Sequence, residues 1–219
     1  MQEIFGGVFF EDRKLFTENS VPGYKPFDEE LVKRGKREFR TWNPRRSKLG
    51  AAIVKGIKSM PIKKGDKILY LGAAHGMTPT FVANIVKESG ILYAVEFSDR
   101  CFNNLLPICE KYTNITPIMA DARKPEEYYW IEKVDVVFID VAQPDETEIA
   151  IRNCKEFLKP GGYLLMAIKS RSIDVTKSPG LIYKEEMAKL RKGGFEIIDW
   201  KTLDPLEKAH AFIVAKSKD

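Results

Sequence analysis

The sequence predicts an α/β fold with a mostly parallel sheet and helices on both of its faces. An apolar run at 68–71 stops at a glycine, which is typical of a strand buried on both faces. From residue 67 onward, strand-length apolar runs alternate with segments of helical periodicity, which favours βαβ units. Gly72 and Gly76 then flank a turn of small residues, as in turns whose backbone approaches a nucleotide-type ligand closely.

The first quarter of the chain has a different character. Residues 1–55 predict a small β-rich N-terminal domain, followed by a Rossmann-like domain over residues 56–219. Short strands are expected at 8–10 and 14–17. A helix is expected over 47–58, because its apolar residues recur at every fourth position before Pro61.

The elements of the larger domain follow from the same patterns. Strands are expected at 67–71, 91–95, 115–119, 134–139, 162–168, 195–201 and 210–215. Helices are expected at 79–88, 98–111, 145–158 and 181–192. Thr78 suits the N-cap of the first of these helices and Pro79 its first turn. The last two strands are separated by a short turn, which indicates an antiparallel hairpin at one edge of the sheet.

Composition limits the class of protein. The 219 residues are 44% hydrophobic, which is enough for a sizeable core, and carry a net charge of +5. The three cysteines have no metal-ligand spacing, so we expect reduced thiols, a cytoplasmic location and no metal site. Neither a signal peptide nor a membrane span is expected, because no apolar run reaches the necessary length.

A basic stretch lies between residues 33 and 48. Its eight cationic residues are Lys33, Arg34, Lys36, Arg37, Arg40, Arg45, Arg46 and Lys48. One interpretation is a solvated strand face; the other is a surface that follows RNA phosphates, since Phe39 and Trp42 are interleaved with the charges. The sequence leaves both open.

Polar residues follow the carboxyl ends of successive strands, where ligands of such sheets bind. Glu96 follows the second strand of the larger domain, Asp121 the third and Asp140 the fourth. Each carboxylate alone is compatible with a turn residue. Together, beside a turn of small residues, they favour an adenosine site in which Glu96 accepts from ribose hydroxyls and Asp121 meets the adenine.

Several of these segments together resemble the fibrillarins. They are Trp42–Leu49, Tyr70–Ala74, Tyr93–Ser98, Asp121–Arg123, Asp140–Pro144 and His210–Ala211. The resemblance implies a class I S-adenosylmethionine-dependent methyltransferase fold, with a seven-stranded mostly parallel sheet, an antiparallel edge hairpin and a small N-terminal β-rich domain. It also implies methylation of RNA ribose 2′-hydroxyls, and an archaeal-type, cytoplasmic member without the Gly/Arg-rich tail. His75 and Met77 depart from the serine and threonine that are common there.

The resemblance further implies the roles of individual residues. The cofactor S-adenosyl-L-methionine would be contacted by Ala73, Thr78, Glu96, Phe97, Asp121, Ala122, Asp140 and Gln143. The catalytic set would be Lys48, Asp140, Lys169 and His210, with Lys169 activating the hydroxyl and Asp140 orienting it. RNA would meet Arg45, Arg46 and Lys48. Gln143 also suits capping of the helix after it, and Lys169 and His210 suit a solvated strand end and a core histidine.

The implied partners are a box C/D guide RNA with its target RNA, a coiled-coil scaffold protein of the Nop family and a kink-turn-binding ribosomal-type protein. Three other functions remain to be weighed. A nicotinamide-dependent oxidoreductase is opposed by the missing G-x-G-x-x-G. A non-catalytic RNA-particle subunit is opposed by the intact catalytic set, and a protein methyltransferase is the remaining alternative.

Overall fold

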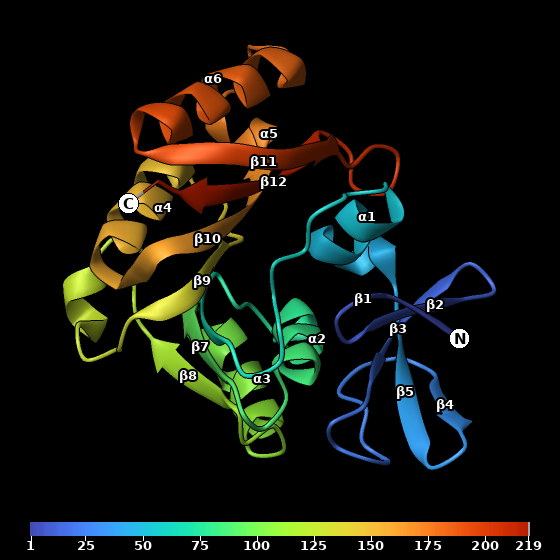
Figure 1. Cartoon of the computed structure of the whole chain (residues 1–219). Helices are drawn as coiled ribbons and strands as arrows, with labels where there is room; N and C mark the ends of the chain where they lie inside the picture. Colours follow the sequence, from blue (N-terminus) through green and yellow to red (C-terminus); the bar gives the residue numbers. More distant parts are fainter. Residues whose placement is uncertain (219) are drawn as a thin grey trace.

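A computed structural model of the chain describes residues 1–218 and contains two sheets (Figure 1). The N-terminal sheet is antiparallel, with the strand order β1-β2-β3-β5-β4. Its strands are β1 (Gln2–Phe5), β2 (Val8–Glu11), β3 (Lys14–Glu18), β4 (Leu31–Arg34) and β5 (Arg37–Trp42). The sequence therefore indicated β2 and β3 individually, whereas the basic stretch turns out to supply β4 and β5.

The larger sheet has seven strands in the order β11-β12-β10-β9-β6-β7-β8. They are β6 (Lys67–Leu71), β7 (Ile91–Glu96), β8 (Ile115–Met119), β9 (Val134–Ile139), β10 (Leu158–Lys169), β11 (Phe195–Thr202) and β12 (His210–Ser217). Strands β6 to β10 are parallel, and β12 runs antiparallel to β10 and to the edge strand β11. The predicted fold class, including the antiparallel edge hairpin, is confirmed.

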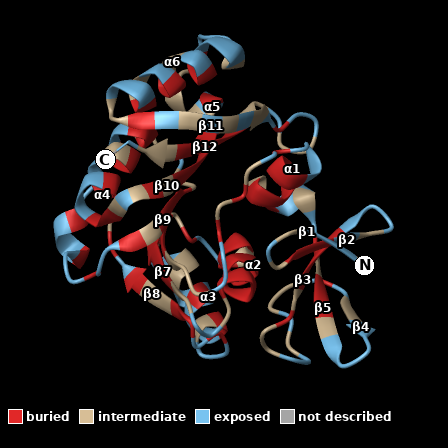
Figure 2. Cartoon of the chain, viewed as in Figure 1, coloured by how far each residue is buried: buried red, intermediate tan, exposed pale blue. Residues whose placement is uncertain are grey.

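Helices cover both faces of this sheet (Figure 1). They are α1 (Lys48–Val54), α2 (Met77–Val86), α3 (Asp99–Cys109), α4 (Glu146–Phe157), α5 (Ser170–Ile173) and α6 (Pro179–Lys192). Two short 3-10 helices, η1 (Pro44–Arg46) and η2 (Pro125–Tyr128), complete the set. Side chains of β6 alternate between the faces: Ile68 and Tyr70 belong to the hydrophobic cluster that includes α1, α2 and α3, whereas Leu69 and Leu71 belong to the cluster that includes α4 and α6. Figure 2 shows the resulting burial along the strands and α2.

The N-terminal sheet is joined to the larger domain through α2. Val8, Leu15 and Trp42 belong to the same hydrophobic cluster as the apolar face of α2. The Trp42 ring is stacked on Phe81 of that helix with centroids 4.7 Å apart. The division of the chain at residue 55 stays a prediction, since the core is continuous across it.

Two predicted helix ends are wrong. The helix expected over 47–58 ends at Val54, because Gly56 takes a positive φ of 81° and its amide donates to the Ile53 carbonyl. The helix expected over 79–88 begins at Met77, and its N-cap is Gly76 with a φ of 87°. Thr78 therefore lies inside the first turn and is not the cap.

Strand β10 is longer than expected. It begins at Leu158, which pairs with Val134, and a register shift separates this pair from Tyr163 and Val136. The Pro-Gly-Gly sequence at 160–162 is therefore an irregularity within β10. Among the described residues, no helix has the length and apolar character that crossing a membrane requires.

Candidate active site

The carboxyl ends of the central strands open onto two adjoining hollows. The first has a volume of about 220 Å³ and includes Glu96, Phe97, Asp121, Ala122 and Gln143 in its lining. The second has a volume of about 360 Å³ and includes Phe27, Arg46, Lys48, Ala73, His75 and Thr78. Gly72, Ala74 and Asp140 line both. The structure thus brings the predicted cofactor-contacting residues and the predicted catalytic residues Lys48 and Asp140 to one region of the sheet edge.

The floor between the hollows depends on Gly72. This residue has a φ of +86°, and a Cβ atom there would lie 2.8 Å from the main-chain oxygen of Asp140. The backbone after β6 and the backbone after β9 are therefore in direct contact. Only glycine permits both the conformation and the approach, so Gly72 determines where Asp140 sits.

Glu96 holds the turn after β6. Its carboxylate accepts hydrogen bonds from the amides of Ala74 and Ser98, each at 2.8 Å. The residue is only 6% exposed, yet it lines the first hollow. A carboxylate has about four acceptor positions, so after these two bonds Glu96 still has acceptors for a pair of ribose hydroxyls.

Asp121 lines the same hollow after the neighbouring strand β8. Its carboxylate receives Arg123 through Nε, at 3.0 and 3.1 Å, and through Nη2 at 2.7 Å. The hydrogen bonds from Arg123 hold the pKa of Asp121 below its usual value. Phe97 is 63% exposed at the rim, so a flat ring in the hollow has an aromatic surface available for packing.

The remaining predicted cofactor residues are also placed. Gln143 lines the first hollow in the loop before α4, whose N-cap is Asp145. Nothing among the described contacts makes Gln143 a helix cap. Ala73 and Thr78 line the second hollow, where the first turn of α2 presents its amide groups.

Three predicted catalytic residues form one cluster. Asp140 follows β9, Lys169 ends the neighbouring strand β10, and Lys48 begins α1. The Lys169 ammonium lies 2.7 Å and the Lys48 ammonium 3.3 Å from Asp140 Oδ1. Neither approach has the direction of a hydrogen bond, so both are charge contacts. Lys169 Nζ donates instead to the main-chain oxygen of Asp140.

His210 joins this cluster through strand register. It is the direct partner of Lys169 across the antiparallel pair of β10 and β12, so the two side chains share one face of the sheet. Its Nδ1 lies 2.7 Å from the Lys208 carbonyl oxygen. Because a carbonyl oxygen only accepts, Nδ1 donates the hydrogen in this contact. No contact of His210 with Asp140 is present among the described residues.

Two polar residues of the site were missed in the sequence. Tyr70 is fully buried on β6, and burial, with the nearby Asp140 carboxylate, raises the pKa of its phenol well above the ordinary value. Thr78 donates to Ser47 Oγ at 3.0 Å, and Ser47 is the N-cap of the helix that carries Lys48. The sequence signal for Ser47 was available, since a serine before a helical segment suits an N-cap. Tyr70 has no such signal, because it lies within an apolar strand and is indistinguishable there from a core residue.

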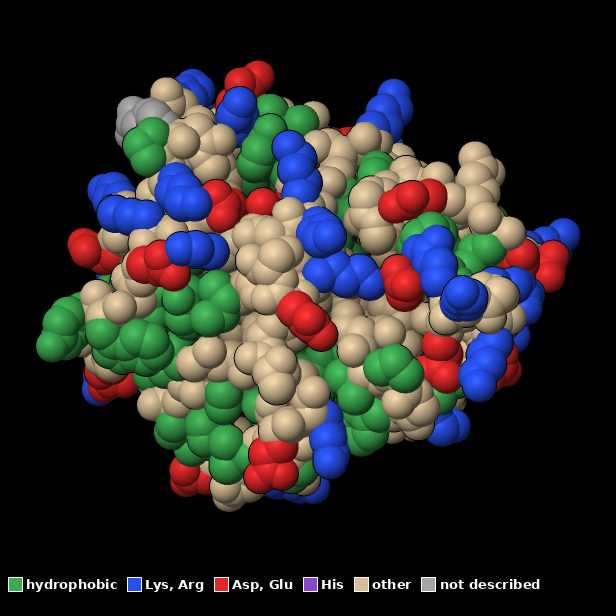
Figure 3. Space-filling view, turned by 60° about the horizontal axis from the view of Figure 1, so that its bottom comes forward, with side chains coloured by type: hydrophobic (Ala, Val, Ile, Leu, Met, Phe, Trp, Pro, Cys, Tyr) green, Lys and Arg blue, Asp and Glu red, His purple; other side chains and the backbone are tan. Residues whose placement is uncertain are grey.

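The basic stretch is largely paired with acidic side chains. Five of its eight cationic residues lie in ion pairs: Arg34 with Glu11, Arg37 with Glu18, Arg40 with Glu29, Arg46 with Asp28 and Lys48 with Asp140. Arg40 is completely buried, so it cannot meet RNA. On the face shown in Figure 3, Lys and Arg side chains are interspersed with Asp and Glu rather than gathered in one field. The structure thus favours the solvated-face interpretation for the cationic residues at 33–37, which are exposed, while Arg45 and Arg46 are exposed at η1.

Comparison with known proteins assigns the chain to a family. The family model described as Fibrillarin matches residues 1–219. The chain belongs to the fibrillarin family. This confirms the resemblance read from the sequence motifs.

Individual relatives agree over almost the whole chain. The fibrillarin-like rRNA/tRNA 2′-O-methyltransferase of Methanocaldococcus jannaschii is 50% identical, over 98% of this chain and 95% of the relative. The structure of Aeropyrum pernix fibrillarin with natively bound S-adenosyl-L-methionine is 46% identical, with a TM-score of 0.86, over 92% of this chain and 88% of that one. A fibrillarin/Nop5p complex is 38% identical, with a TM-score of 0.88, over 98% and 99%.

Proposed function

We propose that this fibrillarin-family protein is an S-adenosylmethionine-dependent RNA ribose 2′-O-methyltransferase that acts on rRNA and on tRNA. The observation that carries the proposal is the cluster of Lys48, Asp140 and Lys169 beside the second hollow. Two lysine side chains and a carboxylate at one point suit a step in which a hydroxyl is held, oriented and deprotonated. The M. jannaschii relative carries this activity in its name.

The site fits S-adenosylmethionine. Glu96 and Phe97 suit the ribose and adenine, and Gly72 presents bare backbone to both hollows. The first turn of α2, near Ala73 and Thr78, offers amides and a positive helix end to the carboxylate of the methionine part. The A. pernix family member binds this molecule.

The chain's own residues supply positioning and a base. When bound, S-adenosylmethionine supplies an electrophilic methyl group on a sulfonium. Lys169 Nζ accepts the proton that the 2′-hydroxyl loses as its oxygen takes the methyl group. Asp140 orients Lys169, and Lys48 and His210 complete the network and hold the ribose.

RNA and protein partners complete the proposal. Arg45, Arg46 and Lys48 meet the RNA near the site, but most of the basic stretch is neutralised, so the isolated chain binds RNA weakly and in a salt-sensitive way. A box C/D guide RNA selects the target. By analogy with the fibrillarin/Nop5p complex, a Nop-family scaffold binds this chain and, together with a kink-turn-binding protein, brings it to the guide–target duplex. The particle acts in the cytoplasm.

The test is reconstitution with guide RNA, Nop-family scaffold and kink-turn protein, followed by mapping of 2′-O-methyl groups after incubation with labelled S-adenosylmethionine. The assembled particle should methylate the target ribose opposite the guide, and Lys169→Ala should abolish it while cofactor affinity stays within threefold. Lys159→Ala is the matched control, because Lys159 lies on the same strand at its opposite end and is likewise paired with an aspartate, Asp135, at 2.5 Å. Absence of methylation by the intact particle, or full activity of Lys169→Ala, would refute the proposal.

A further inference from the structure

A buried carboxyl group lies directly behind the proposed base. Glu146 is the first residue of α4, and it is completely buried. Its Oε1 accepts a hydrogen bond from the main-chain amide of Lys169 at 3.1 Å. Its Oε2 is also buried and has no hydrogen-bond partner among the described residues. Burying a carboxyl group with an unpartnered oxygen costs free energy of folding. We therefore look for a role of Glu146 beyond that of an acidic residue at a helix start.

The geometry of the sheet explains why Lys169 needs this contact. Strand β9 ends at Ile139, which pairs with Met166 of β10. Lys169 lies three residues further along β10, where β12 still flanks it through His210 but β9 no longer does. The Glu146 carboxyl takes the place of the missing strand. Without it, the Lys169 amide would lose its partner at the edge of the site.

Lys169 is therefore held by both ends of one loop. Residues 140–145 run from β9 to α4 and include Ala142 and Gln143, which line the first hollow. At the start of this loop, the Asp140 carboxylate forms an ion pair with the Lys169 ammonium. Directly after the end of the loop, the Glu146 carboxyl accepts a hydrogen bond from the Lys169 main-chain amide. A ligand that orders the loop thereby orders both ends of the lysine.

We propose that Glu146 is a positioning residue for methyl transfer, whose buried carboxyl fixes the main chain of Lys169 and ties the cofactor-lining loop 140–145 to the base. The inference rests on the proposed role of Lys169. Glu146 acts through Lys169 and does not touch the reacting atoms.

The charge state of Glu146 matters to this role. Burial raises the pKa of Glu146 to about 8, so it is a neutral acid at pH 7. The charged groups that face it are Lys169 on β10, Asp140 after β9 and Glu186 on α6, and Glu186 is itself buried and paired with Lys189 at 3.0 Å. Above pH 8 an ionised Glu146 repels the carboxylates of Glu186 and Asp140, and so disturbs the Asp140 side chain that orients Lys169.

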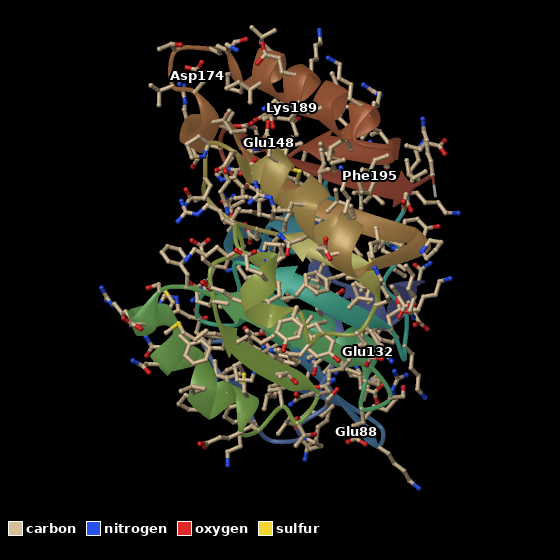
Figure 4. All side chains as sticks on the ribbon, turned by 90° about the vertical axis from the view of Figure 1, so that its left-hand side faces the viewer. Glu88, Glu132, Glu148, Asp174, Lys189 and Phe195 are labelled. Atoms are coloured by element: carbon tan, nitrogen blue, oxygen red, sulfur yellow. The ribbon has the colours of Figure 1, made fainter. Side chains whose placement is uncertain are left out.

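Three variants separate positioning from helix stability. Glu146→Gln keeps the accepting oxygen and removes the ionisation, whereas Glu146→Leu removes both at similar volume. Glu148→Gln is the matched control, because Glu148 lies in the same first turn of α4 but is half exposed and paired with Lys189 at 2.9 Å (Figure 4). It alters a carboxyl group in the same turn of α4 without touching the contact to Lys169.

The first measurement is single-turnover methylation in the reconstituted particle between pH 6 and 9.5. Glu146→Leu should slow the step at least tenfold, with S-adenosylmethionine affinity within threefold. Glu146→Gln should match the unaltered chain within threefold at pH 7, and its advantage should grow at least threefold by pH 9. Identical pH profiles for the Gln variant and the unaltered chain, or a normal rate for a folded Leu variant, would overturn the inference.

The second measurement needs no activity. Amide hydrogen exchange of Lys169 should accelerate at least tenfold in Glu146→Leu and stay unchanged in Glu148→Gln. Unchanged exchange in Glu146→Leu would overturn the inference even if ribose methylation is observed. Accelerated exchange together with an inactive unaltered particle would instead refute only the proposed function.

Discussion

A buried ion pair between Arg40 and Glu29 offers the sharpest test of how the N-terminal sheet is attached. Arg40 Nη2 lies 2.6 Å from Glu29 Oε1, and the two side chains are 0% and 5% exposed. The same nitrogen donates to Thr80 of α2 at 3.2 Å, and the guanidinium lies 4.3 Å from the centroid of the Phe81 ring. We predict that Arg40→Met severely destabilises the chain.

The magnitude follows from what the substitution leaves behind. Removing Arg40 strands the Glu29 carboxylate in a dry site, and breaking such a buried pair costs about 3–5 kcal/mol. That is a large fraction of the roughly 5–15 kcal/mol by which a domain is stable. Replacing both partners, as in Arg40→Met with Glu29→Met, removes the stranded charge and should recover much of the loss. Glu29 also accepts from the Phe27 amide at 3.0 Å, so the loop that lines the second hollow should loosen as well.

Urea unfolding followed by tryptophan fluorescence measures the effect, since Trp42 is stacked on Phe81 beside the pair. The control is Arg34→Met, which removes a half-exposed pair with Glu11 and should cost no more than about 1 kcal/mol. If Arg40→Met costs no more than this control, or if the double substitution is worse than either single one, the pair does not hold the N-terminal sheet in the way argued.

Three further predictions concern the site. Glu96→Ala should weaken S-adenosylmethionine binding by about 1.5–3 kcal/mol in calorimetry, and Asp121→Ala by less, because Arg123 already occupies its carboxylate; unchanged affinity for both would contradict the pocket. Lys169→Arg should not rescue methylation in single-turnover assays, since arginine keeps the charge but cannot act as a base, and a near-native rate would make Lys169 an electrostatic clamp. The folded-state pKa of Glu146, near 8 against an ordinary 4.5, means that the folded chain binds the extra proton, so stability falls as pH rises between these values. Glu146→Gln should therefore gain about 2 kcal/mol over the unaltered chain between pH 6 and 8 in urea unfolding, and a pH-independent difference would refute the assignment.

The order of elements in the larger domain was predictable because it rests on local patterns. Apolar runs and glycines mark where strands stop, and the strand ends carry Glu96, Asp121, Asp140 and Lys169 into one edge of the sheet. Helix ends were less predictable. The start of α2 depends on the φ of Gly76, which the sequence allows but does not impose.

The sequence by itself determined the fold class, the family and the residue types of the site, because motifs of consecutive residues carry that information. Only the tertiary structure decided which charges meet. Arg40, one of a run of cations, is buried on Glu29 rather than exposed, and Glu146, which suits a helix N-terminus, turns inward to Lys169. Burial and pairing depend on segments far apart in the chain, and the electrostatic consequence of each charged side chain follows from those neighbours.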